Sequence, residues 1–156
     1  MACIGRSLYH CALVEIINKV GYQLEILRTG KFIIYKDNRK IYVDMSGRNL
    51  PYYGRNGAEG FPWETYIKLE RLDNVEREAK EYGAEAWIAY CYAILSEDYY
   101  SYFSTTVNIK GRKFGAKFID TESFRRYMQE RSPHSWDAVD LPRDRVPLIT
   151  VNPEKI

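Results

Sequence analysis

The chain has 156 residues, of which 46% are apolar and 28% charged, and its formal net charge is +2. These values suit a globular protein with one core and exclude a disordered chain, while so small a net charge identifies no polyanionic partner by itself. The longest apolar run, 86–94, is too short to cross a membrane and the sequence starts without an apolar signal segment, so we expect a cytoplasmic protein.

The first predicted element is a helix, and a strand follows it. Apolar residues recur with helical spacing at Leu13, Ile16, Ile17 and Val20. Gly21 ends this pattern, because glycine readily takes the left-handed conformation after a helix. The alternating stretch YQLEILR at 22–28 then predicts a strand that turns at 29–30.

A hairpin comes next, in the stretch KFIIYKDNRKIYVDMSGR at 31–48. Two alternating runs flank Asp37-Asn38, a pair suited to a tight turn. In the second run Asp44 shares a face with Tyr42 and Ser46, opposite the apolar positions, and a glycine-rich loop is predicted at 46–63. A carboxylate there could bind Mg²⁺, whereas the alternative interpretation is a solvated strand position.

The remaining elements alternate between helices and strands. We predict a helix over 64–82, a strand buried on both faces over 84–95, a tyrosine-rich extension at 96–112, a strand over 113–120, a helix over 121–132 and an irregular tail at 133–156. This order predicts one α/β (α+β) domain over 1–156, with a central mixed sheet between helices. The 14 tyrosines and the scarcity of glutamine are typical of thermophilic proteins.

The same order of elements carries a family resemblance over residues 8–128. The pair Gly21-Tyr22 ends the first helix, Tyr66–Arg71 opens a second helix that ends at Gly83, and KFID-TESFRRY closes the pattern. This arrangement resembles the archaeal Holliday junction resolvases of the PD-(D/E)xK, or restriction-endonuclease-like, nuclease superfamily. The resemblance implies a metal-dependent endonuclease that uses Mg²⁺ or Mn²⁺ on double-stranded or branched DNA, with a homodimer as a candidate assembly.

The positions of the family's catalytic residues carry different side chains in this sequence. The resemblance places the acid of the first helix on His10, the Asp of the second strand on Phe32 and the Gln of the second helix on Arg71. It places the Glu and Lys of the E-x-K motif on Asp44 and Ser46. One acidic position is therefore kept, and the resemblance implies a non-standard active site.

Several residues could complete such a site. Glu85 opens the buried strand that should lie beside the strand of Asp44, so we predict that Asp44 and Glu85 hold the metal ion. His10 could ligate the metal or transfer a proton, and its alternative role is a hydrogen-bonded residue at the edge of the core. The missing lysine could be replaced by Lys36, Lys40 or Lys68; Lys68 is included in the predicted catalytic set.

The predicted loop also indicates nucleic-acid binding. Its sequence RNLPYYGR interleaves cations that can neutralise phosphates with aromatic rings that can stack on bases. The predicted contacts are Arg48, Tyr52, Tyr53 and Arg55, with Arg71 added from the second helix. The leading hypothesis is a metal-dependent DNA nuclease, and the alternative is a catalytically inactive nuclease-fold protein that binds nucleic acid or a partner subunit. A third is a homo-oligomeric structural protein.

Overall fold

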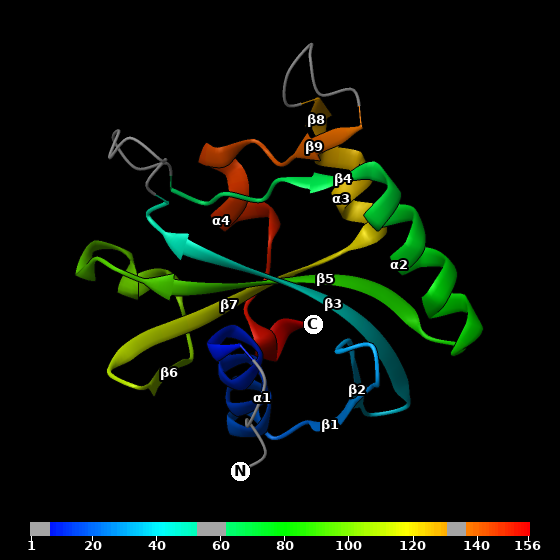
Figure 1. Cartoon of the computed structure of the whole chain (residues 1–156), viewed down its shortest axis with the longest axis horizontal. Helices are drawn as coiled ribbons and strands as arrows, with labels where there is room; N and C mark the ends of the chain where they lie inside the picture. Colours follow the sequence, from blue (N-terminus) through cyan, green and yellow to red (C-terminus); the bar gives the residue numbers. More distant parts are fainter. Residues whose placement is uncertain (1–6, 53–61, 131–136) are drawn as a thin grey trace.

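A computed structural model describes residues 7–52, 62–130 and 137–156. Its centre is a curled six-stranded sheet with the order β1-β2-β3-β5-β7-β6 (Figure 1). The strands are β1 (Gln23–Ile26), β2 (Phe32–Lys36), β3 (Arg39–Leu50), β5 (Glu85–Ile94), β6 (Thr106–Ile109) and β7 (Arg112–Asp120). Only β3 and β5 are parallel; every other neighbouring pair is antiparallel. The predicted mixed sheet is confirmed.

Helices cover both faces of this sheet (Figure 1). Helix α1 (Leu8–Val20) lies on one face, and α2 (Leu69–Glu81) and α3 (Thr121–Tyr127) lie on the other with a small second sheet. That sheet has the order β4 (Ile67–Lys68), β9 (Ala138–Asp140), β8 (Gln129–Glu130). The remaining elements are short: η1 (Glu97–Tyr102), η2 (Arg143–Arg145), α4 (Val146–Ile149) and η3 (Pro153–Lys155). Within the described ranges no helix is long and apolar enough to span a membrane.

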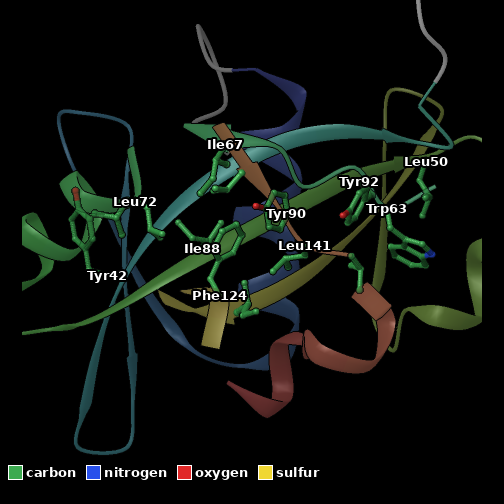
Figure 2. Packing of buried hydrophobic residues seen from close by; sticks show 14 of the residues in the cluster. Tyr42, Leu50, Trp63, Ile67, Leu72, Ile88, Tyr90, Tyr92, Phe124 and Leu141 are labelled. Atoms are coloured by element: carbon green, nitrogen blue, oxygen red, sulfur yellow. The ribbon is translucent and has the colours of Figure 1, made fainter. Parts of the chain in front are cut away.

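The sheet separates two apolar clusters, one under each helical layer. The cluster under α2 and α3 is rich in aromatic rings and includes Tyr42, Tyr90, Tyr92 and Phe124 (Figure 2). The cluster under α1 combines phenylalanine rings with many small and aliphatic side chains, Val43 and Cys91 among them. Because side chains alternate along a strand, each side chain of β3 and β5 points toward one cluster or the other.

The register of β3 on β5 fixes which residues share a face. Asp44 lies opposite Ile88, and Ile41 lies opposite Glu85. Ile88 belongs to the α2 cluster and Ile41 to the α1 cluster. Asp44 therefore faces α2, whereas Glu85 points to the face that α1 covers.

Helix α2 begins at Leu69, five residues later than predicted. The residues before it run extended, because side chains of the sheet bind their carbonyl groups. Tyr92 donates to the Glu64 carbonyl at 3.3 Å, Tyr90 to that of Thr65 at 2.7 Å and Arg48 to that of Tyr66 at 2.6 Å. A helix starting at 64 would use these carbonyls as its own first acceptors, so the cross-sheet bonds replace helical ones.

Strand β3 continues to Leu50, beyond its predicted end at Ser46, because β5 pairs with it over this whole length. Strand β2 pairs with β3 only as far as Val43. In the described part of the chain, the stretch 44–50 therefore has a neighbouring strand on one side alone. We call this stretch the open edge of β3.

The C-terminal part of the chain is more regular than predicted. Helix α3 ends at Tyr127 rather than at 132, and the stretch 96–112 contains η1 and the edge strand β6. In the predicted irregular tail, 137–156 includes β9 and α4, and Val151 pairs with Phe118 of β7 through two backbone hydrogen bonds of 2.8 Å.

Candidate functional site

Asp44, the predicted metal ligand, is buried and bound to Arg71. The side chain of Arg71 donates from Nε to Oδ2 at 2.7 Å and from Nη2 to Oδ1 at 3.0 Å. Its Nη2 also donates to the carbonyl oxygen of Met45 at 2.8 Å. The hydrogen bond to Asp44 raises the pKa of Arg71 above its ordinary value, against the opposing effect of burial. Both oxygens of Asp44 are thus engaged by a permanent cation.

Glu85, the second predicted ligand, lies on the opposite face of the sheet. Arg39 donates to its two oxygens at 2.7 and 2.8 Å, and Trp87 donates to Oε1 at 3.2 Å. The bond from Arg39 lowers the pKa of Glu85. The prediction that Asp44 and Glu85 hold one metal ion is therefore wrong, because the sheet stands between them and each carboxylate pairs with its own arginine.

The catalytic positions assigned by resemblance do not converge either. Phe32 lies opposite Val43 and faces α1, where its ring is 5.5 Å from the ring of His10. Asp44 and Ser46 face the other way. On the His10 side, the open edge of β3 presents Met45 and Gly47.

Gly47 leaves room for an aromatic ring rather than for a catalytic side chain. A Cβ atom at this position would lie 2.4 Å from the Tyr9 ring, far inside van der Waals contact. Tyr9 and His10 both come from the first turns of α1, and the Ser7 hydroxyl lies 2.9 Å from His10 Nδ1. His10 therefore sits at the edge of the α1 cluster beside Phe32, as its alternative interpretation proposed.

The donor set on either face does not fit Mg²⁺ or Mn²⁺. Such ions take carboxylate and water oxygens as ligands, and the predicted site offers one carboxylate that a guanidinium already neutralises. Within 7–52, 62–130 and 137–156, no group of three or more His, Cys, Asp and Glu residues is arranged to hold a metal ion. No step of a mechanism through a metal ion follows from these residues.

Cations gather at the start of α2, next to Asp44. A hollow of about 290 Å³ is lined by Lys31, Asp44, Lys68, Glu70, Arg71 and Asn74. Lys31 pairs with Glu78 at 2.8 Å, whereas Lys68 is exposed and makes no ion pair with a described residue. The Nη1 group of Arg71 likewise makes no hydrogen bond to a residue that the structure describes. We call Lys68 and Arg71 the cation pair.

A second hollow, of about 410 Å³, lies at the far end of the open edge. Besides Gly47, its lining consists of Tyr9, Arg48, Asn49, Tyr52, Glu64 and Tyr66. We call it the tyrosine pocket. Two of the predicted nucleic-acid contacts, Arg48 and Tyr52, thus lie together here; Tyr53 and Arg55 lie outside the described residues.

Sequence reasoning missed most of this pocket. Tyr9 and Asn49 come from α1 and β3, and Gly47 was predicted to lie in a loop. Had the strand been predicted to its end at Leu50, a glycine inside it would have indicated a close approach. Glu64 is buried; its Oε1 accepts the backbone N–H of Tyr66 at 2.9 Å and its Oε2 lies 3.6 Å from Nη2 of Arg143. Its position before the second helix made Glu64 a candidate replacement acid for a metal site, but no pattern in the sequence predicts its burial or its place in this pocket.

Comparisons with known proteins show the fold and little more. No protein-family model and no curated protein sequence matches the chain. Among solved structures, the chain is similar to Hjc, a Holliday junction resolvase from the archaeal hyperthermophile Archaeoglobus fulgidus, with a TM-score of 0.53 and 12% identity. The match covers 92% of this chain and 94% of that one. The chain therefore has a restriction-endonuclease-like, nuclease-type fold.

Proposed function

We propose that this chain is a nuclease-fold protein that binds DNA and does not hydrolyse it through a metal ion at Asp44. The observation that carries this proposal is the bidentate contact between Arg71 and Asp44. Metal-assisted phosphodiester hydrolysis needs ligand oxygens for a cation that polarises the phosphate and activates water. A carboxylate that is already paired with an arginine would have to break that pair first.

The cations along β3 support DNA as the ligand. Lys68 and Arg71 lie beside Asp44, and Arg48 lies four residues further along the same strand. Four residues of a β-strand span about 13 Å, which equals the rise of about four nucleotides along one strand of a DNA duplex. Arginine and lysine side chains spaced in this way can contact successive parts of one phosphate backbone. Because the fold is similar to that of a Holliday junction resolvase, branched DNA is the first ligand to test; a homodimer stays a prediction.

The test combines cleavage and binding on one pair of substrates. A four-way junction and a linear duplex of equal length are incubated with the protein in Mg²⁺, in Mn²⁺ and in chelator. We expect no cleavage. We also expect a binding constant whose logarithm falls linearly with the logarithm of the salt concentration. Lys68→Ala should reduce that slope by about one, because it removes one phosphate contact.

The matched control is Lys80→Ala, at the other end of the same helix and also exposed. We expect it to leave the salt slope unchanged. Cleavage that needs Mg²⁺ or Mn²⁺ and disappears in Asp44→Asn would overturn the proposal in favour of a nuclease. Absence of salt-sensitive binding to either DNA would overturn the assignment of DNA as ligand.

A further inference from the structure

The tyrosine pocket has the size and position of a site for one group projecting from a DNA strand. Its volume of about 410 Å³ is within the range of small-ligand pockets, and it opens at the end of the open edge of β3. A strand that follows the cations from Lys68 to Arg48 would reach the mouth of this pocket. What this pocket binds is therefore inferred on the basis of the proposed function, DNA binding.

Aromatic rings from three separate segments form the walls of the pocket. Tyr9 belongs to α1, Tyr52 follows β3 and Tyr66 precedes β4. The ring of Tyr9 is held on three sides: its hydroxyl donates to Asn49 at 2.8 Å, it meets Phe114 edge-on at 5.7 Å, and Gly47 leaves room for it. Tyr52 is 38% exposed, so a flat ligand can reach its ring. Rings positioned before binding suit the stacking of a nucleobase.

The polar groups of the pocket offer both acceptors and donors to the edge of a base. Glu64 is buried at 4% exposure; its Oε1 accepts the backbone N–H of Tyr66 and its Oε2 lies 3.6 Å from Nη2 of Arg143. A carboxylate has about four acceptor positions, so it can accept a hydrogen bond from a ligand as well. The side-chain amide nitrogen of Asn49 has no hydrogen bond to any residue the structure describes. Arg48 is fixed by bonds to the carbonyl oxygens of Gly47 at 2.8 Å and Tyr66 at 2.6 Å. Such a mixture reads the edge of an unpaired base, which displays donors and acceptors together.

Cations flank the aromatic walls. Arg48 lines the pocket, and Arg112 lies two residues before Phe114 in β7, on the same face as the ring that Tyr9 contacts edge-on. Both guanidinium groups lower the pKa of Tyr9, against the larger effect of burial. Arg112 opens β7 directly after the tight turn at 110–111, and Lys110 and Arg112 are both exposed. Charges on either side of an aromatic pocket can neutralise the phosphates that flank a bound base.

We infer that the tyrosine pocket binds one unpaired nucleobase of a DNA strand, stacked on its tyrosines and held at its edge by Glu64, Arg48 and Asn49. The phosphates next to that base lie toward Arg48 and Arg112. Paired bases do not enter, because their edges are already engaged by the partner strand. The pocket thereby gives the protein a preference for DNA that exposes a base at a bulge, a branch or a strand end.

The experiment uses two duplexes of the same sequence that contain 2-aminopurine, a fluorescent base, either paired or as a one-base bulge. We expect the wild-type protein to bind the bulged duplex at least fivefold more tightly and to quench its fluorescence through stacking on tyrosine. Tyr52→Ala should weaken binding to the bulged duplex about fivefold or more and change binding to the paired duplex less than twofold. Tyr66→Ala, a second wall residue, should show the same selectivity.

The control is Tyr35→Ala, which removes an equally exposed tyrosine from β2, away from the pocket. It should alter neither affinity. Equal affinities for the two duplexes, unaffected by Tyr52→Ala and without a fluorescence change, would overturn the base site and leave DNA binding intact. Failure to bind either duplex would overturn the proposed function itself. Binding of the free 2-aminopurine nucleotide as tightly as the bulged duplex would show a small-molecule site instead of a strand-bound one.

Discussion

At the scale of single residues, Gly47 fixes how closely α1 approaches the sheet. The Tyr9 ring occupies the volume where any side chain at position 47 would begin. The backbone at this glycine is ordinary strand, so the requirement is one of space and not of conformation. This single contact sets the wall of the tyrosine pocket.

Gly47→Ala should therefore destabilise the protein by about 1–3 kcal/mol, the usual cost of overpacking a close contact. In a Tyr9→Ala background the same change should cost much less, because the new methyl group meets no ring. Urea denaturation of the four proteins gives the coupling energy. Equal costs in the two backgrounds would show that Tyr9 is not the obstacle.

The pair formed by Asp44 and Arg71 makes a second prediction at this scale. Arg71→Met leaves a carboxylate of 6% exposure without its partner and should cost about 2 kcal/mol. The double variant Asp44→Leu/Arg71→Met should recover most of that loss, since well-packed apolar residues often replace a buried ion pair at little cost. Thermal unfolding measures the stability of both variants. Losses of stability that simply add would show that Asp44 and Arg71 act independently.

At the scale of elements, the extended segment 64–68 holds the start of α2 against the sheet. Tyr90 is fully buried and its hydroxyl donates to the Thr65 carbonyl at 2.7 Å, the shortest bond from a tyrosine to this segment. Burial also raises the pKa of Tyr90 well above its ordinary value, so the hydroxyl remains a donor at neutral pH. The segment therefore depends on donors that come from another layer of the molecule.

Tyr90→Phe should destabilise the protein by about 1–2 kcal/mol, because the carbonyl of Thr65 loses its partner in a buried site. Tyr92→Phe should cost less, since its bond to Glu64 is 3.3 Å long. Hydrogen exchange should locate the effect of Tyr90→Phe in 64–68. Equal protection of this segment in wild type and variant would contradict the assigned role.

These elements show which parts of the fold the sequence predicts. The apolar stripes of α1 and α2, the turn at Asp37-Asn38 and the buried strand β5 were all readable, because their signals are local. The start of α2 could not be predicted from the sequence, since the hydrogen-bond donors that keep 64–66 extended lie on β3 and β5. At 64–66, contacts made across the sheet outweigh the helix propensity of the local sequence.

The candidate site was predicted less well than the fold, for a related reason. Adjacent strands were correctly inferred for Asp44 and Glu85, but their faces depend on the register of a parallel pair, which no turn fixes. A shift of one residue moves a side chain to the other face. The pairing of Asp44 with Arg71 was likewise hidden. Arg48 and Tyr52 were grouped correctly in space because they lie in one short aromatic and basic stretch, and their role as nucleic-acid contacts stays a prediction.

At the scale of the whole molecule, Lys117 joins segments that are distant in sequence. It lies in β7 at 3% exposure and donates to the carbonyl oxygen of Tyr102, at the end of η1. It also donates at 2.9 Å to the side chain of Asn152, next to η3. Burial lowers its pKa from 10.5 to about 8.

This lowered pKa gives a testable dependence of stability on pH. Below pH 8 the lysine is charged in both states and its burial opposes folding. Between about pH 8 and 10.5 the folded state has released the proton while the unfolded chain still holds it, so this group's contribution to stability rises with pH. Relative to Lys117→Met, the wild type should gain stability from pH 7.5 to pH 9.5, as measured by urea denaturation. A difference in unfolding free energy between the wild type and Lys117→Met that stays constant over this pH range would contradict the prediction.

The open edge of β3 has a consequence for how the molecule behaves in a crowded solution. An unpaired strand edge can pair with strands of other chains, and such pairing leads to aggregation. Here Arg71 and Arg48 donate to the carbonyl oxygens of Met45 and Gly47 on that stretch. An incoming strand would have to displace two charged side chains before it could pair, so these arginines act as gatekeepers against amyloid-like growth.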